Sequence, residues 1–145
     1  MNGAPARIVF ACIHNAGRSQ MAAALFNAVA DPHVAAAVSA GTHPGPHVHP
    51  VVVDAMQEVG VDLTQCSPTL LTDDLARGAT LLVTMGCGEA CPHVPGLQRD
   101  DWPLADPKGR PMDEVRAIRD DIANRVRALA TARGWLRSAA PSTTG

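Results

Sequence analysis

The chain has 145 residues, which suits a single domain with one hydrophobic core, and its formal net charge at pH 7 is −2. Aromatic residues make up 3% of the sequence and tyrosine is absent, so neither a basic surface nor stacking rings indicate a nucleic-acid partner. Its four cysteines are too few for a disulfide scaffold, and no signal-peptide pattern or apolar run of about 18 residues occurs, so we expect a cytosolic protein with no membrane partner.

The first predicted unit is a buried strand followed by a helix. The strand covers Arg7–Ala11, a short apolar and β-branched run. The helix covers Ser19 to about Val29, because Ala, Met and Leu favour it, Ser19 can cap it, and Asp31-Pro32 ends it. A strand that enters a helix through a loop of small residues is typical of a βα unit.

Four shorter elements are predicted next. Val34–Ala40 is a second strand, because the sequence that follows it is rich in residues that break regular structure. Pro50–Val59 has apolar residues at helical spacing, with its proline in the first turn. Leu70–Ala76 predicts a short helix with Thr72 as a possible cap, and Thr80–Thr84 predicts another buried strand.

The C-terminal part is predicted as a long loop and a long helix. Residues 85–111 are rich in proline and glycine and are expected to form mostly loop. Residues 113 to about 135 carry apolar side chains every three or four positions, the pattern of an amphipathic helix. We expect one domain over residues 1–136 and a disordered tail over residues 137–145.

Alternating strands and helices predict an α/β fold, a parallel sheet with helices on both faces. Ligands of such sheets bind beyond the carboxyl ends of the strands. Cys12 and residues 85–87 both follow predicted strands and are expected at that edge.

The loop CIHNAGRS at 12–19 has the composition of an anion-binding site. Ile13 to Gly17 can wrap a tetrahedral anion with backbone N–H groups, and the helix that follows adds its positive end. Arg18 supplies a fork of donors, and Cys12 beneath the anion would be held as a thiolate. The alternative is that Cys12 is only a small buried apolar residue and Arg18 a solvated one.

The segment Val9–Ala22 resembles the C-x5-R-S loop of the low-molecular-weight tyrosine phosphatase fold, and its Ser-Gln-Met-Ala continuation is similar to the thioredoxin-coupled arsenate reductases of that fold. The resemblance continues through SAG at 39–41, VTM at 83–85, Trp102, DPKG at 106–109 and the last helix. It implies a single-domain, four-stranded parallel sheet flanked by helices. It also implies an oxyanion loop made of Ile13, His14, Asn15, Ala16, Gly17, Arg18 and Ser19.

The same resemblance implies a reaction with three cysteines in series. Cys12 would attack arsenate, Cys87 would attack Cys12 and release arsenite, and Cys91 would then attack Cys87. An external redoxin, thioredoxin or a mycoredoxin-like protein, would reduce the resulting disulfide. Asp106 would be the general acid that protonates the leaving oxygen.

The residues themselves leave other uses of these thiols open. Cys87 and Cys91 are four positions apart, and helical geometry separates such Cβ atoms by about 5–6 Å, too far for a disulfide unless the segment distorts. Zinc binding with His93, or two unrelated structural cysteines, are the alternatives. A thiol module that binds a metal or arsenite without catalysis is a further one, and it would need neither Arg18 nor Asp106.

Departures from the family pattern narrow the expected activity. Lys108-Gly109 stands where many family phosphatases have aromatic residues, which argues against tyrosine phosphatase activity and leaves a lesser phosphatase activity as the alternative. Ala23 stands where some reductases have an acidic potassium ligand, so no metal is expected. We expect a monomer with no bound cofactor, whose loop accepts arsenate and also phosphate or sulfate.

Four residues outside these motifs are predicted to have no role in the chemistry. His43, His47 and His49 lie in a Pro- and Gly-rich segment and are expected to be solvated rather than metal-binding. Cys66 is expected to be a partly buried bystander.

Overall fold

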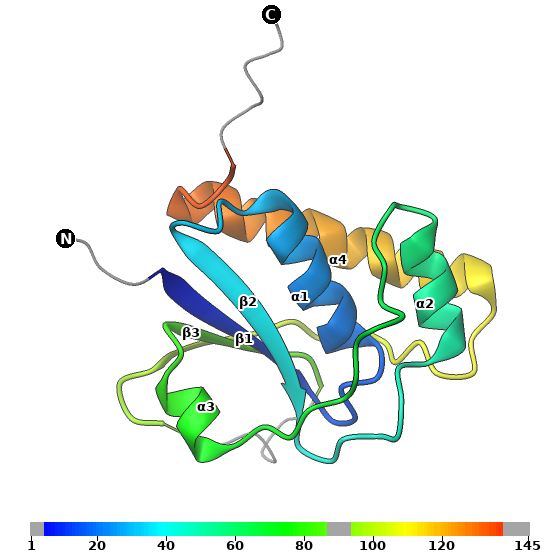
Figure 1. Ribbon diagram of the computed structural model, residues 1–145, viewed down its shortest axis with the longest axis horizontal. Helices are drawn as coiled ribbons and strands as arrows, with labels where there is room; N and C mark the ends of the chain where they lie inside the picture. The colour runs from blue at the N-terminus through cyan, green and yellow to red at the C-terminus, as the bar shows by residue number, and fades with distance from the viewer. Residues whose placement is uncertain (1–4, 87–93, 138–145) are drawn as a thin grey trace, which may run out of the picture.

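The computed structural model describes residues 5–86 and 94–137 (Figure 1). Within these residues the chain forms, in order, β1 (Ala6–Cys12), α1 (Arg18–Val29), β2 (Ala35–Gly41), α2 (Pro50–Gln57), α3 (Asp73–Arg77), β3 (Leu81–Thr84), β4 (Gln98–Asp101) and α4 (Met112–Arg133). None of the helices in this part of the chain is long and apolar enough to cross a lipid bilayer.

The strands form one sheet in the order β2-β1-β3-β4, and every neighbouring pair is parallel. Cys12 at the end of β1 lies opposite Gly41 at the end of β2, and Ala11 lies opposite Thr84 at the end of β3. The carboxyl ends of these three strands therefore meet at one edge. This confirms the predicted α/β fold and its four-stranded parallel sheet.

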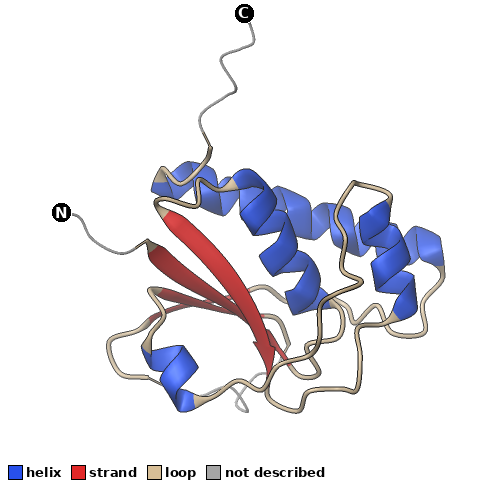
Figure 2. Ribbon diagram, in the orientation of Figure 1, coloured by secondary structure: helices blue, strands red, loops and turns tan. Residues whose placement is uncertain are grey.

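The sheet separates two hydrophobic cores of unequal size. Ile8 and Phe10 of β1 belong to the larger core, whereas Val9 and Ala11 belong to the smaller one, because successive side chains of a strand point to opposite faces. In Figure 2 the helices α1, α2 and α4 lie on one side of the sheet and α3 lies on the other. Both faces of β1 are covered from Ile8 to Cys12, which is why this part of the strand is apolar throughout.

Two predicted helix caps have different outcomes. Thr72 caps α3 as predicted, since its hydroxyl accepts a hydrogen bond from the backbone N–H of Leu75 at 3.1 Å. The prediction that Ser19 caps α1 is wrong, because the helix begins one residue earlier and its N-cap is Gly17. The Ser19 hydroxyl is used by the site described below.

Three predictions lie outside the described residues. Cys87 and Cys91 both belong to the segment 87–93, and the expected tail lies almost wholly in 138–145. The three-thiol relay and the domain boundary at residue 136 therefore stay predictions.

Candidate active site

Cys12 lies at the carboxyl edge of the sheet, where β1 passes into the loop 13–17. Its side chain is buried, with 2% of the residue exposed, and its Sγ lies 2.9 Å from Ser19 Oγ. Asn15 Nδ2 donates a hydrogen bond of 2.7 Å to the same Ser19 oxygen. Because that oxygen already accepts a hydrogen bond from Asn15, its own hydrogen is free to point toward the sulfur.

The loop turns its carbonyl groups away from its hollow. The carbonyl oxygens of Ile13, His14 and Ala16 accept hydrogen bonds from the backbone N–H groups of His43, Gly45 and His49, at 2.7, 2.9 and 2.9 Å. The C=O and N–H of a trans peptide point in opposite directions. The N–H groups that follow these three carbonyls therefore point away from the backbone N–H groups of His43, Gly45 and His49, an arrangement that suits an anion site.

Asn15 fixes the shape of the loop. Its φ of 52° places it in the left-handed region, which asparagine tolerates better than most residues. Its Oδ1 accepts hydrogen bonds from the backbone N–H of Thr69 at 2.8 Å and from Gln20 Nε2 at 3.1 Å. Gln20 also donates to the carbonyl of Ser67 at 3.2 Å, so the loop is tied to the chain that follows α2.

Arg18, the first residue of α1, lines the same pocket as Cys12 and is held there by a backbone carbonyl. The residue is 9% exposed, and its Nη1 donates to the carbonyl of Leu104 at 3.0 Å. A Cβ on Gly86, which has a φ of +99°, would lie 2.6 Å from the same Nη1. Glycine is needed there both for its backbone conformation and for the space that Arg18 takes. The chain thus reaches Gly86, the residue before Cys87, directly beside Arg18.

Asp106 faces Arg18 from the loop that precedes α4. Its Oδ2 lies 3.8 Å from Arg18 Nη2, and its Oδ1 accepts from the backbone N–H of Lys108 at 3.0 Å. The next residue, Pro107, packs on Gly17, where an added Cβ would lie 2.8 Å from the proline Cγ. This packing holds Asp106 against the pocket that Cys12 and Arg18 also line.

The structure therefore brings together the predicted residues that it describes. A small pocket at the sheet edge is lined by Cys12, His14, Ala16, Gly17, Arg18, His49 and Asp106. Cys12, Arg18 and Asp106 come from three separate parts of the sequence, and the sheet topology places them within one cavity. The roles of these residues in a reaction are taken up below as proposals.

Sequence reasoning missed two features of the site and misplaced a third residue. His49, expected in a solvated segment, is partly buried and lines the pocket; burial lowers its pKa although the Asp106 charge acts to raise it. Gly41 has no room for a side chain, since a Cβ there would lie 2.6 Å from the carbonyl oxygen of Ile13. Cys66, expected to be partly buried, is exposed. Gly41 and His49 both lie in the segment GTHPGPHVHP at 41–50. Its glycines and prolines are the sequence signal for both features, because such residues allow the backbone to approach the neighbouring loop closely.

The chain matches the family described as low molecular weight phosphotyrosine protein phosphatase over residues 7–134. It is 32% identical to an arsenate reductase of Staphylococcus aureus over 120 residues, which covers 79% of this chain and 88% of that relative.

Two solved structures resemble it over most of its length. The thioredoxin-dependent arsenate reductase of Corynebacterium glutamicum has a TM-score of 0.78 and 36% identity, and the match covers 91% of this chain and 63% of that one. This chain thus spans less than two thirds of that relative. The arginine phosphatase of Geobacillus stearothermophilus has a TM-score of 0.75 and 25% identity, with 90% and 94% covered. From its fold, its loop and these matches, the chain belongs to the low molecular weight phosphotyrosine protein phosphatase family.

Proposed function

We propose that this protein reduces arsenate to arsenite with a reactive thiolate at Cys12. One observation carries the proposal: Cys12 Sγ lies 2.9 Å from a hydroxyl that is itself held by Asn15, at the floor of a loop whose carbonyls face outward. The similarity to arsenate reductases of Staphylococcus aureus and Corynebacterium glutamicum supports arsenate as the substrate.

The loop and Arg18 bind the oxyanion in this proposal. Arsenate is tetrahedral, and the inward N–H groups and the guanidinium fork match its oxygens. Removing one preorganised donor of this kind costs about 3–4 kcal/mol of transition-state stabilisation, which corresponds to a rate loss of a hundredfold or more. Phosphate and sulfate share the geometry and would occupy the same loop.

The first step makes a bond between sulfur and arsenic. The Cys12 thiolate attacks arsenate, and one arsenate oxygen leaves as water after it receives a proton. Asp106 is the proton donor in this account, because its half-exposed carboxyl group lies at the mouth of the same pocket. Arsenic remains in its pentavalent state until the next step.

The second and third steps use Cys87 and Cys91. The Cys87 thiolate attacks the Cys12 sulfur, the sulfur–arsenic bond breaks, and arsenic keeps the electron pair and leaves as arsenite. Cys91 then attacks Cys87, which frees Cys12 and leaves a Cys87–Cys91 disulfide. The position of Gly86 against Arg18 supports this order, since the chain enters the 87–93 segment beside the loop.

An external dithiol restores the two thiols. The Corynebacterium glutamicum relative is described as thioredoxin-dependent, which favours thioredoxin as the reductant; a mycoredoxin-like protein is the alternative. We propose a monomer that acts in the cytosol, where such redoxins keep thiols reduced.

Phosphatase activity is the second candidate function, and the arginine phosphatase of Geobacillus stearothermophilus supports it. Hydrolysis would use Cys12, Arg18 and Asp106 but neither of the other two thiols. The chain has no tyrosine and carries Lys108-Gly109 after Asp-Pro, which disfavours an aromatic substrate ring.

A coupled assay separates the two functions. Arsenate is supplied with thioredoxin, thioredoxin reductase and NADPH, and NADPH consumption is followed for the wild type and for Cys12→Ser, Cys87→Ser, Cys91→Ser and the control Cys66→Ser. We expect turnover in the wild type and in Cys66→Ser alone. Sustained turnover in Cys91→Ser would contradict the relay, whereas phosphate ester hydrolysis that survives Cys87→Ser would reveal the phosphatase.

A further inference from the structure

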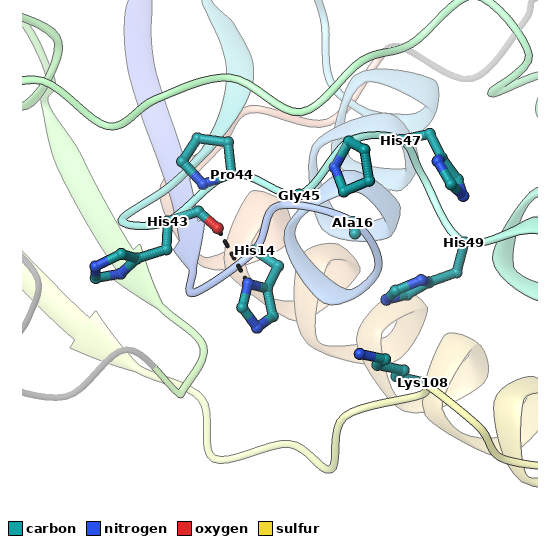
Figure 3. A pocket seen from close by; sticks show the side chains of 9 residues that line it. His14, Ala16, His43, Pro44, Gly45, His47, His49 and Lys108 are labelled. Carbon is teal, nitrogen blue, oxygen red and sulfur yellow. Dashed lines mark hydrogen bonds between the residues drawn. The ribbon is translucent and has the colours of Figure 1, made fainter.

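A second, larger pocket opens beside the oxyanion loop. It has a volume of about 470 Å³, and we call it the histidine pocket. It is lined by His14, Ala16, His43, Pro44, Gly45, Pro46, His47, His49 and Lys108 (Figure 3). Four of the six histidines of the chain therefore lie around one cavity, although 35 residues separate the first from the last.

The histidine pocket continues from the anion site. His14, Ala16 and His49 line both cavities, so the two cavities adjoin one another. Free arsenate fills only the site above Cys12, and a pocket of this volume is of the size that binds small organic molecules. The structure thus has room for a substituent on the oxyanion.

The lining of the histidine pocket selects for negative charge. Lys108 supplies a cation, the imidazoles supply hydrogen bonds and titratable charge, and none of the lining residues is acidic. Figure 3 shows the Lys108 amine next to the His49 ring and the His14 ring held by the carbonyl of His43, at 3.0 Å. Pro44 and Pro46 supply apolar wall.

Metal binding does not explain the cluster. In residues 5–86 and 94–137 no three His, Cys, Asp or Glu side chains lie close enough together to hold a metal ion. The rings surround a cavity instead of converging on one point.

We propose that the histidine pocket is a subsite for a second acidic group on the oxyanion ligand. The ligand class is a small organic phosphate or arsenate ester, or sulfonate, whose first anionic group lies above Cys12 and whose second, a carboxylate, sulfonate or phosphate, lies near Lys108. The inference rests on the anion site of the proposed function but requires no reductase activity.

The preference of the histidine pocket for a second anionic group should depend on pH. Histidine is the side chain whose charge changes most readily between about pH 8 and pH 6, and each proton that a histidine gains adds a positive charge. His49 is faced by Asp106, Lys108, His47 and His14, and its partial burial lowers its pKa, so it gains its charge at a lower pH than an ordinary histidine does. The advantage of a dianionic ligand therefore grows as the pH falls.

Two probes with the same carbon chain test the proposal. They are 1,3-propanedisulfonate and 1-propanesulfonate, which stay fully ionised over this pH range, so any pH effect belongs to the protein. Each is used to protect Cys12 from alkylation by neutral iodoacetamide in the full chain, and the Cys12 peptide is followed by mass spectrometry.

We expect the disulfonate to protect at a concentration about threefold to tenfold lower at pH 7, with a larger ratio at pH 6. Lys108→Gln and His47→Gln each lower the ratio toward one, while His33→Gln, an exposed histidine away from the pocket, leaves it unchanged. Equal protection by the two probes, or protection by neither, overturns the proposal. Arsenate reduction by the same wild-type sample is measured separately. A failure of the second-anion proposal can therefore be told apart from a failure of the proposed reductase function.

Discussion

At the scale of single residues, the hydroxyl of Ser19 links Asn15 to the Cys12 sulfur. A hydrogen bond to a charged group contributes about 1.5–3 kcal/mol, so Ser19→Ala should lower the reactivity of the proposed Cys12 nucleophile about tenfold or more. We expect the alkylation rate of Cys12 by iodoacetamide at about pH 6 to fall accordingly, followed by peptide mass spectrometry. Cys66 is the internal control, since it is exposed. An unchanged Cys12 rate would show that this hydroxyl does not stabilise the thiolate.

A substitution at Asp106 tests whether this residue is the proton donor of the first step. Asp106→Asn keeps the size of the side chain and removes its acidic proton, so we expect kcat for arsenate reduction to fall about a hundredfold to ten-thousandfold while KM changes little. Arsenite production is the measurement, and Asp54→Asn, an exposed substitution in α2, is the matched control. A kcat within about threefold of the wild type would remove Asp106 from the chemistry.

At the scale of elements, the contact between Gly17 and Pro107 couples the N-terminus of α1 to the loop that carries Asp106. Gly17→Ala places a Cβ 2.8 Å from Pro107 Cγ, so the proline and the neighbouring carboxylate must shift. A displacement of about 1 Å in a catalytic group can cost a hundredfold, and we expect kcat/KM for arsenate to fall at least tenfold. Gly78→Ala is the control, because its Cβ would make only ordinary contacts, at 3.5 Å or more. Equal activity of the two variants would show that this packing does not position Asp106.

The elements also show what sequence can and cannot predict. β1 was predictable because both of its faces are buried, which requires a continuous apolar run. β4 was not, because its four residues, Gln98–Asp101, are all polar and exposed, and only pairing with β3 makes them a strand. The loop 13–17 between β1 and α1 was predictable from its small, turn-prone residues, whereas the place of His49 depends on how the segment after β2 folds back on that loop.

At the scale of the whole molecule, Glu58 joins the end of α2 to α4. Its carboxylate pairs with Arg116 Nη2 at 2.7 Å and with Arg119 Nη1 at 2.9 Å, and Arg119 also donates to the carbonyl of Ala55 at 2.8 Å. Hydrogen bonds from Arg116 and Arg119 lower the pKa of Glu58 to about 2, from an ordinary value of 4.5.

Because the folded pKa is the lower one, the stabilisation is present above about pH 4.5 and is lost as the pH falls toward about 2. We expect Glu58→Gln to unfold at a lower urea concentration than the wild type at about pH 6, and the difference to shrink at about pH 3. Because the pair is partly exposed, added salt should also shrink it. A difference that is the same at both pH values would contradict this account.

In the proposed relay, electrons pass from the thiols to arsenic through Cys12, and a single turnover without external reductant follows this transfer. Each chain receives one equivalent of arsenate, arsenite is quantified, and the disulfides are mapped by mass spectrometry in the wild type, Cys91→Ser and Cys12→Ser. We expect about one arsenite per wild-type chain with a Cys87–Cys91 disulfide, a trapped Cys12–Cys87 disulfide in Cys91→Ser, and no arsenite from Cys12→Ser. Arsenite from Cys12→Ser, or a wild-type product whose disulfide excludes Cys87, would contradict it.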